Sequence, residues 1–227
     1  MRHGEAVTCG GTVRAAGGGW APRQAFRSPD PFLHPEPSVL RLFVALAVPD
    51  AVKASLGEVQ RELAEALPVE STGWTRSDAM HLTLRFLGDV EAARVPDLEC
   101  ALREALGGFG AFDVVCEGLG CFPDLRFPRV VWAGVRDAGE RLVRLHETID
   151  VAVDDFAPTS AEATFVGHVT LARPKHLRRA DAERLAHAVE AAADRRFGAW
   201  RAGEVELIRS DPGPAGSRYT TLARIAM

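Results

Sequence analysis

The sequence HLTL at residues 81–84 returns almost unchanged as HVTL at residues 168–171. Each copy alternates a polar residue with an apolar one, and this alternation is typical of a β-strand with one buried face. Successive side chains of a strand point to opposite faces, so the histidine and the threonine of each copy share a face. The repeat therefore predicts two strands that each present a His and a Thr to one side, with the apolar pair packed into a core.

Two histidines presented in this way can serve one cleft. The unperturbed pKa of histidine lies near neutral pH, so one imidazole can protonate a leaving oxygen while the other takes a proton from water. A threonine hydroxyl can donate a hydrogen bond to a phosphoryl or carbonyl oxygen. We therefore predict an enzyme that acts on a compact anion such as a phosphodiester and needs no cofactor. Its catalytic residues are His81 and His168, and Thr83 and Thr170 bind the substrate.

Metal binding by the same histidines is the main chemical alternative. A metal site would want a third or fourth His, Cys or carboxylate at ligand spacing, and none lies beside either motif. We therefore expect no metal site. The sequence also contains no P-loop, no G-x-G-x-x-G segment after a strand and no G-x-S-x-G elbow. Four other histidines stand alone, and we interpret them as surface or helix-face residues: His34, His146, His176 and His187.

Composition and charge narrow the class of protein. Of the 227 residues, 47% are hydrophobic and 26% are charged, which is typical of a globular protein. The net charge of −4 argues against a protein that binds nucleic acid through bulk electrostatics. The four cysteines lack C-x-x-C spacing, which favours reduced thiols in a cytoplasmic protein. No apolar run approaches the length that spans a membrane, and we expect a monomer.

The N-terminal segment differs from the rest of the chain. Residues 1–38 are rich in glycine and proline and show no sustained apolar period. Such a composition cannot bury enough surface to offset the entropy of ordering. We interpret this segment as a disordered tail or as an extension from a misplaced start codon, with a partner-binding arm as the alternative. Residues 39–227 are expected to form a single bilobal domain.

From residue 40 onward strands and helices interleave, and several strand pairs are joined by short turns that require antiparallel pairing. This pattern predicts an α+β fold with two pseudo-symmetric lobes, in which a cleft between the lobes is the natural ligand site. The expected strands are 40–48, those at residues 81 and 168, 112–116, 129–135, 205–209 and 218–226, with a turn at 118–123. The expected helices are 50–67, 96–106, 139–153 and 180–195.

With these motifs in place, the chain resembles the 2H phosphoesterase superfamily, named for its paired His-x-Thr-x motifs. Within it, the resemblance is to the bacterial and archaeal RNA 2′,3′-cyclic phosphodiesterases, which are also called 2′-5′ RNA ligases. It spans residues 40–226 and includes Ser210 and the segment GSRY at 216–219. The segments that carry it are RLFVAL at 41–46, HLTLRFLG at 81–88, FP at 122–123 with PRVVW at 128–132, and HVTLAR at 168–173.

The resemblance implies a bilobal fold in which two mainly antiparallel sheets face a central cleft, with helices outside. It implies hydrolysis of an RNA or nucleoside 2′,3′-cyclic phosphate to a 2′-phosphomonoester. In these roles His81 donates a proton to the leaving 3′-oxygen, His168 accepts one from water, and the threonines hold the phosphate. The motifs themselves are so alike that they leave the assignment of acid and base open. The chain departs from the family where an Arg and a Pro usually precede the second His, since residues 164–167 read TFVG.

Several further side chains are candidates for contacts with the substrate. Arg85 lies two residues past Thr83, so it shares the face of the motif if the strand continues. Arg173 lies three past Thr170, and alternation places it on the opposite face unless the strand bends near Pro174. Either arginine can pair with phosphate, with a solvated surface role as the alternative. Two sets are weaker candidates: Lys175, His176, Arg178 and Arg179 for RNA or a solvated loop, and Phe43 and Phe86 for base stacking or core packing.

Two alternatives to a hydrolase stay open. The first is a catalytically weak RNA-binding module that keeps the cleft without useful turnover. The second keeps the site but joins 2′-5′ RNA ends reversibly. In each case the expected partner is RNA with a 2′,3′-cyclic phosphate end, or a small cyclic nucleotide.

Overall fold

The computed structural model describes residues 38–66, 72–157, 164–175, 177–214 and 216–227. These residues belong to one compact unit, Pro37–Met227. The predicted tail falls outside the described residues except for its last residue, and His176 of the predicted basic cluster also falls outside them.

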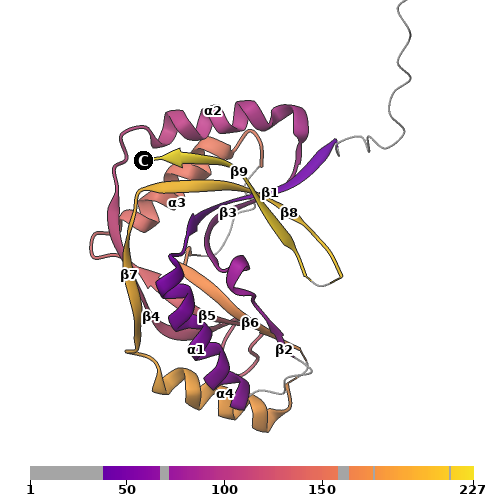
Figure 1. The fold of residues 1–227 in the computed structure, drawn as a ribbon, viewed down its shortest axis with the longest axis vertical. Coiled ribbons are helices and arrows are strands. Elements are labelled where there is room, and N and C mark those ends of the chain that lie inside the picture. The colour runs from indigo at the N-terminus through magenta and orange to yellow at the C-terminus, as the bar shows by residue number, and fades with distance from the viewer. Residues whose placement is uncertain (1–37, 67–71, 158–163, 176, 215) are drawn as a thin grey trace, which may run out of the picture. The chain divides into compact units, whose positions relative to one another are not determined.

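Helices and strands alternate along the unit (Figure 1). The strands are β1 (Val39–Ala47), β2 (Thr72–Trp74), β3 (His81–Glu91), β4 (Phe112–Phe122), β5 (Val130–Arg136), β6 (His168–Pro174), β7 (Arg196–Ala202), β8 (Glu204–Asp211) and β9 (Arg218–Ala226). The helices are α1 (Asp50–Ala66), α2 (Val95–Leu106), α3 (Arg141–Val153) and α4 (Arg179–Ala191), with short 3₁₀ turns at Ser77–Ala79 and Ala92–Arg94.

The strands form one curled antiparallel sheet in the order β7-β4-β5-β6-β3-β1-β8-β9, with β2 added beside β6. The two motif strands, β3 and β6, are neighbours at its centre and meet where Leu82 opposes Val169. The resemblance implied two sheets. In the structure these two sheets are joined into one through the pairing of β3 with β6. The predicted antiparallel α+β fold is confirmed.

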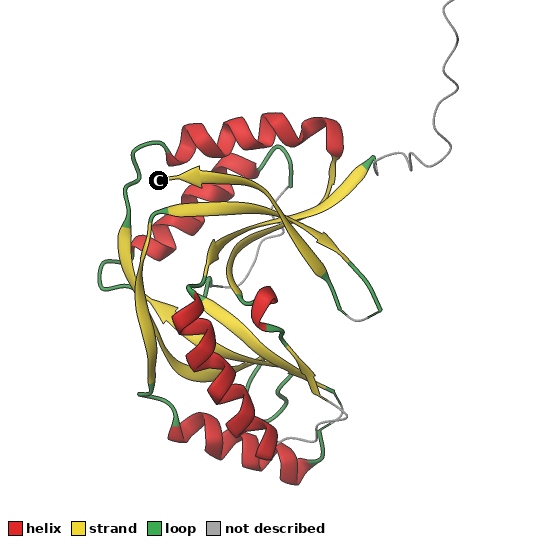
Figure 2. Cartoon of the chain, viewed as in Figure 1, coloured by secondary structure: helices red, strands yellow, loops and turns green. Residues whose placement is uncertain are grey.

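Each half of the sheet carries its own pair of helices (Figure 2). Helices α2 and α3 contact each other and pack on β9 and β3, whereas α1 and α4 contact each other and pack on β7, β6 and β4. The lobes are therefore not the two halves of the sequence. Helix α1 follows β1 but packs in the other lobe, and α3 follows β5 but packs behind β3, so the chain crosses between lobes repeatedly.

The core lies between the sheet and the helices. The apolar residues of both motifs, Leu82, Leu84, Val169 and Leu171, are buried in it with the inward faces of the helices. On α1 these are Val52, Leu56, Val59 and Leu63, spaced three or four residues apart as the period of a helix requires. Burying one such side chain stabilises the fold by about 1.5–3 kcal/mol. Packing of the apolar pair leaves the His and Thr of each motif on the other face of the sheet.

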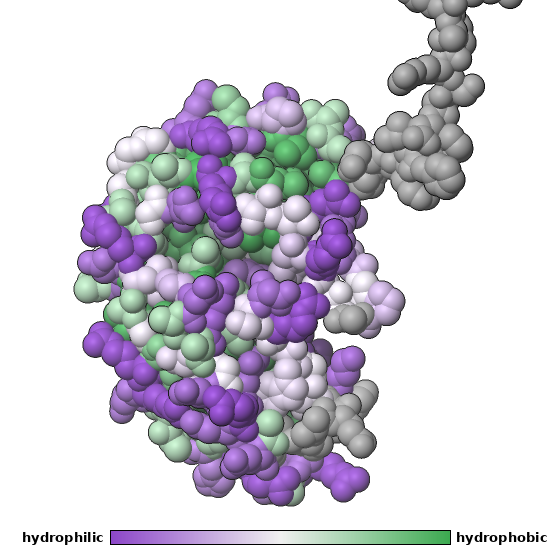
Figure 3. Space-filling view, viewed as in Figure 1, coloured by the Kyte–Doolittle hydropathy of each residue, from purple (hydrophilic) through white to green (hydrophobic). Residues whose placement is uncertain are grey.

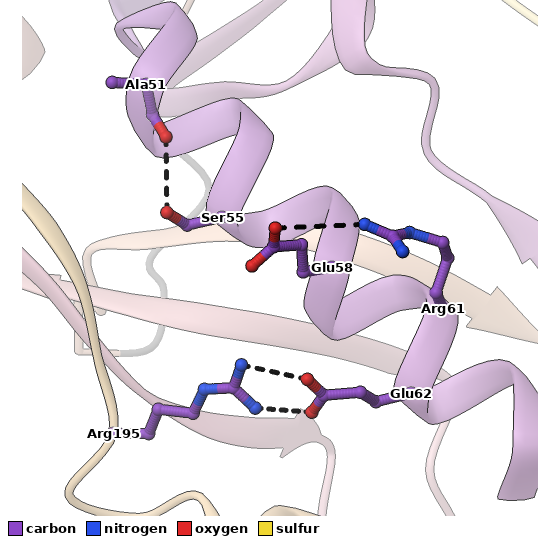
Figure 4. A network of polar contacts seen from close by, with 6 residues as sticks. All are labelled: Ala51, Ser55, Glu58, Arg61, Glu62 and Arg195. Atoms are coloured by element: carbon purple, nitrogen blue, oxygen red, sulfur yellow. Dashed lines mark hydrogen bonds and ion pairs between the residues drawn. The ribbon is translucent and has the colours of Figure 1, made fainter.

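The outer surface of the lobe that contains α1 and α4 is largely hydrophilic (Figure 3). Polar contacts along α1 are drawn in Figure 4, where Glu62 forms a two-pronged ion pair with Arg195, just before β7. This hydrogen-bonded guanidinium lowers the pKa of Glu62. The pair joins α1 to the start of a strand that is 133 residues away in the sequence.

Two predicted boundaries are wrong. The turn expected at 118–123 is part of β4, because Gly118 adopts a positive φ of 70° and a register shift between Cys116 and Leu119 absorbs the irregularity without ending the strand. The helix expected to reach residue 195 ends at Ala191, and Arg196–Ala202 forms the unpredicted strand β7. Its sequence, RFGAWRA, contains a glycine and only a weak apolar alternation, so its pairing with β4 rather than its own pattern makes it a strand.

Candidate active site

A cavity of about 360 Å³ lies over the two motif strands. His81, Thr83, His168 and Thr170 all line it, and so does Arg173. Its other polar or aromatic lining residues come from β1, β3, β8, β9 and the β2 region: Arg41, Phe43, Thr75, Phe86, Ser210, Ser217 and Tyr219. The structure therefore brings together five of the six predicted site residues.

Small residues oppose both histidines across the sheet. His81 opposes Ala47 on β1, and His168 opposes Gly134 on β5. Opposed residues of an antiparallel pair lie on the same face with their Cβ atoms about 5 Å apart. At Gly134 a Cβ would lie 2.8 Å from the carbonyl oxygen of Glu117 on β4, so only glycine fits at this position.

Arg85 does not line this cavity, which corrects its predicted place on the motif face. The pairing of β1 with β3 skips Leu84, so Thr83 opposes Ala45 while Arg85 opposes Val44. Val44 belongs to the core under the helices, and Ala45 belongs to the cavity side. This β-bulge turns Arg85 toward α3, where its Nε lies 3.1 Å from Oδ1 of Asp150.

Arg173 reaches the cavity through a matching irregularity. The pairing of β5 with β6 skips Leu171, since Trp132 opposes Thr170 and Val131 opposes Ala172. Ala172 is therefore buried with the core, and Arg173 returns to the cavity face. From the sequence, Arg173 is expected to face the cavity only if the strand bends near Pro174. The strand is irregular at Leu171 instead, with the same result for Arg173.

His81 is partly enclosed by aromatic rings. Its ring centroid lies 4.7 Å from that of Phe43 and 5.1 Å from that of Tyr219, which meets it edge-on. Burial lowers the pKa of His81 to about 4, and the positive charges of His168, Lys53 and Arg173 act in the same direction. A hydrogen bond to the backbone of Ala79 opposes this shift only partly. His81 is therefore neutral in the free protein at pH 7.

His168 has a similar environment. Phe122 meets its ring edge-on with centroids 5.0 Å apart, and its Nδ1 lies 2.8 Å from the carbonyl oxygen of Val166. Burial and the charge of Arg173 lower the pKa of His168, against the effect of the bond to Val166. With Nδ1–H donating to Val166, the neutral imidazole carries its lone pair on Nε2. That tautomer is the one that can accept a proton at Nε2.

The two imidazoles interact electrostatically, because charge on His168 lowers the pKa of His81. A proton on His168 therefore disfavours a proton on His81. Two imidazoles in one cavity can act as general acid and general base when one is protonated and the other neutral.

The remaining candidates are distributed differently. Phe86 lines the cavity and is 64% exposed, whereas Phe43 is buried behind His81. Lys175, Arg178 and Arg179 are exposed and lie outside the cavity lining, and Arg179 pairs with Glu183. His187 is exposed as interpreted, but His146 is largely enclosed and bonded to β3, which corrects its interpretation as an isolated residue.

Sequence reasoning missed Arg41 as a residue of the site. Arg41 shares its face of β1 with Phe43 and Ala45, which is the cavity side. Alternation along β1 could have grouped these three residues, but the strand is apolar on both faces, so its cavity side carried no sequence signal.

The described residues also bear on metal binding and on membrane insertion. Among them no group of three or more His, Cys, Asp or Glu side chains is placed to hold a metal ion. No helix in the described part of the chain is both long and apolar enough to cross a membrane.

Comparison with known proteins gives consistent matches. The family described as LigT like Phosphoesterase matches residues 46–132. The RNA 2′,3′-cyclic phosphodiesterase of Methanothermobacter thermautotrophicus is 30% identical over 185 residues, which cover 81% of this chain and 96% of that protein. The crystal structure of TT0787 of Thermus thermophilus has a TM-score of 0.68 at 27% identity, covering 82% of this chain and 97% of that one. E. coli LigT complexed with phosphate has a TM-score of 0.60 at 25% identity, covering 84% and 99%.

A curled antiparallel α+β fold with these matches defines an enzyme of the 2H phosphoesterase class. Within that class, the chain belongs to the LigT-like phosphoesterase family.

Proposed function

We propose that this protein hydrolyses the 2′,3′-cyclic phosphate of an RNA or nucleoside to a 2′-phosphomonoester without a metal ion. The observation that carries the proposal is the cavity in which two His/Thr pairs from adjacent strands meet Arg173. The name of the archaeal relative, an RNA 2′,3′-cyclic phosphodiesterase, supports this substrate class.

In the proposed reaction, water attacks phosphorus and the bond from phosphorus to O3′ breaks. His168 accepts the proton of the water at Nε2, since its Nδ1 is engaged by Val166. His81 donates its proton to O3′, which leaves as a hydroxyl. The phosphate stays on O2′. His168 then releases its proton to solvent, and His81 takes up a proton again when the next substrate binds. Each proton transfer contributes about 10²–10⁴ in rate.

Burial and, to a lesser degree, charge in the cavity set the protonation state of the two histidines. Both histidines have a lowered pKa in the free protein, partly because Arg173 is close. A bound phosphodiester anion opposes that effect, because a nearby negative charge favours the imidazolium. Substrate binding therefore promotes protonation of His81, the donor. In this proposal Thr83, Thr170 and Arg173, which line the cavity, donate hydrogen bonds to the non-bridging oxygens, where negative charge develops.

The nucleoside is proposed to occupy the rest of the cavity. Phe86 and Tyr219 supply aromatic surface on which a base can stack, and Arg41 supplies a positive charge for the phosphate of a preceding nucleotide. This combination fits the end of an RNA strand. Arg85 takes no part in substrate binding in this proposal, since Asp150 engages it.

The proposed setting is a reducing compartment, with residues 39–227 as the catalytic domain and a monomer as the active form. Cys100, Cys116 and Cys121 are free thiols, which supports a cytoplasmic location. Burial raises the pKa of Cys116 to about 12 and that of Cys121 to about 11, so both stay protonated and unreactive.

The test is product analysis with adenosine 2′,3′-cyclic phosphate in the presence of EDTA. Chromatography should show the 2′-phosphate as the product, formed at the same rate with and without the chelator. A 3′-phosphate product, or loss of activity in EDTA, would overturn the mechanism. Binding without turnover would support the RNA-binding alternative. A joined product from tRNA halves with a cyclic end and a 5′-hydroxyl would instead show that the 5′-hydroxyl replaces water in the same reaction.

A further inference from the structure

A second cavity, of about 430 Å³, adjoins the first and shares Thr83, Phe86 and His168 with it. Its remaining lining includes two residues of α3, His146 and Asp150, which lie one helical turn apart, together with Arg85 of β3 and Phe165. Neither the proposed reaction nor the substrate contacts use this set of side chains.

His146 has a partner on each side of its ring. Its Nδ1 lies 2.8 Å from the carbonyl oxygen of Leu84, and its Nε2 lies 3.4 Å from Oδ2 of Asp150. The ring stacks on Phe165, with centroids 4.3 Å apart and planes inclined by 13°. Nδ1 is the donor to the Leu84 carbonyl oxygen, and the Nε2 contact with Asp150 is an ion pair only when the ring is protonated. These contacts fix the positions of the groups around His146.

The bond to Leu84 falls at the β-bulge. Leu84 is one of two residues that the pairing of β1 with β3 skips, the other being Leu87, and His146 binds the carbonyl oxygen of Leu84. Asp150 engages the next residue, Arg85, whose Nη2 also donates to the carbonyl oxygen of Ala157. Two consecutive residues after Thr83 are therefore held by α3 and the segment that follows it. The bulge decides which side chains face the cavity, because Thr83 and Phe86 face it and Arg85 does not.

The stack on Phe165 reaches the other motif. Phe165 stands three residues before His168, and Val166, which accepts the hydrogen bond from His168, is its neighbour. A single side chain thus contacts the residue after one His-x-Thr unit and the segment that leads into the other. Besides the pairing of Leu82 with Val169, this is a second connection between the two motif strands.

We infer that His146 is a positioning residue that holds the two His/Thr units in register, through Leu84 on one side and Phe165 on the other. This inference rests on the proposed function, because its main readout is hydrolysis of the cyclic phosphate. Misplacement of a catalytic group by about 1 Å can cost about 100-fold in rate.

Three substitutions separate the contacts. His146→Phe keeps a ring for Phe165 and loses both polar contacts, and His146→Ala loses all three. His146→Asn keeps a donor where Nδ1 lies, so it can still bind the Leu84 carbonyl oxygen. The control is His187→Phe on α4, because the His187 side chain is 84% exposed and its ion-pair contact with Glu190 is at 4.0 Å.

The measurement is kcat and KM for adenosine 2′,3′-cyclic phosphate, at a temperature where circular dichroism shows each variant folded. His146→Phe and His146→Ala should lower kcat about 10- to 100-fold with little change in KM, and His146→Asn should restore part of kcat, because it keeps the bond to Leu84 but loses the stack on Phe165. His187→Phe should match the wild type. A folded His146→Phe variant with wild-type kcat would overturn the inference, even if its melting temperature fell.

Failure of the proposed function would look different. If the wild type does not hydrolyse the cyclic phosphate, that proposal fails, and the same variants are compared by the ¹⁵N chemical shifts of the His81 and His168 rings. Positioning by His146 then predicts shifted resonances in His146→Phe and unchanged ones in His187→Phe. Unchanged resonances in His146→Phe would overturn the inference independently of activity.

Discussion

Phe86 and Arg173 occupy equivalent places in the two motif strands. Each is the fifth residue after its histidine, each follows a skipped residue in the strand pairing, and each lines the cavity. The pseudo-symmetry thus extends beyond the His-x-Thr units, but it places an aromatic ring on one side of the cavity and a cation on the other. In the proposed function, the ring of Phe86 stacks on a base and Arg173 binds the phosphate.

Arg173 and Arg85 should therefore respond differently to the same substitution. Arg173→Met removes a cation from the cavity, so KM for the cyclic phosphate should rise about 10- to 100-fold, the equivalent of one charge-assisted hydrogen bond. Arg85→Met should leave KM within about twofold of the wild type and lower the free energy of unfolding by about 1–3 kcal/mol, because Asp150 loses a partly buried partner. Steady-state kinetics and urea unfolding measure the two effects. A larger rise in KM for Arg85→Met than for Arg173→Met would contradict the assigned geometry.

The same substitution should change the titration of the histidines. Burial is the main cause of the lowered pKa of His81 and His168, and the charge of Arg173 adds to it in both. Removing that charge should raise both pKa values toward the ordinary one. NMR titration of the imidazole resonances in wild type and Arg173→Met measures the change. A further decrease in either pKa would show that Arg173 does not act on the pair through its charge.

The pH dependence of catalysis should differ between free and bound enzyme. In the free enzyme both histidines have a pKa below the ordinary value of 6.5, so they lose their protons at acidic pH. The value of kcat/KM should therefore fall as the pH rises through this acidic range. A bound phosphodiester raises both pKa values, so the corresponding fall in kcat should come at higher pH. Profiles of kcat and kcat/KM from pH 4 to pH 9 test this expectation. Coincident basic limbs would mean that substrate charge has no effect on the histidines.

Burial of these histidines also affects the stability of the fold. Catalysis needs a protonated imidazole, whereas the folded state is stabilised when both imidazoles are neutral. A lowered pKa in the folded state favours the neutral rings, so their contribution to stability is present above pH 6.5 and is lost as pH falls toward the folded-state value, about 4 for His81. The free energy of unfolding should therefore decrease between pH 6.5 and 4. Replacing His81 with Phe should reduce that decrease, and an unaltered pH dependence of unfolding would contradict the burial of the ring.

Gly167 lies beside the second motif and should resist substitution. A Cβ there would lie 2.5 Å from the carbonyl oxygen of Val135 and 2.7 Å from Cδ2 of Leu142. Gly167→Ala should therefore destabilise the fold by about 1–3 kcal/mol. Gly57→Ala on α1 is the matched control, since nothing lies within 4 Å of its Cβ and alanine favours a helix by about 0.5–1 kcal/mol. Thermal unfolding compares the two, and an unchanged melting temperature for Gly167→Ala would show that this contact can relax.

Most of the elements and the central pair of strands could be predicted from the sequence. Alternation located β3 and β6, and a period of three to four residues located the buried faces of α1, α2 and α3. These signals are strong because each depends on one element and one buried face. Four site residues follow directly from alternation, and all of them line one cavity: His81, Thr83, His168 and Thr170.

What could not be predicted depends on partners elsewhere in the chain. Strict alternation assigns Arg85 to the cavity and Arg173 away from it, and bulges at Leu84 and Leu171 reverse both assignments. A bulge arises from the pairing with a second strand, so the motif itself carries no sign of it. At Leu84 the carbonyl oxygen is bound by His146 of α3, and at Leu171 it accepts a hydrogen bond from Gln60 of α1. The strand β7 is likewise defined by β4, and the role of His146 appears only once α3 is packed behind β3.

The central claim is that His81 and His168 form one catalytic pair, and single-turnover hydrolysis of adenosine 2′,3′-cyclic phosphate in EDTA tests it most directly. His81→Ala and His168→Ala should each lower the rate at least about 100-fold. The double variant should be no slower than the slower single variant, because residues that act as a unit are not additive. Wild-type rates in either single variant would contradict the claim.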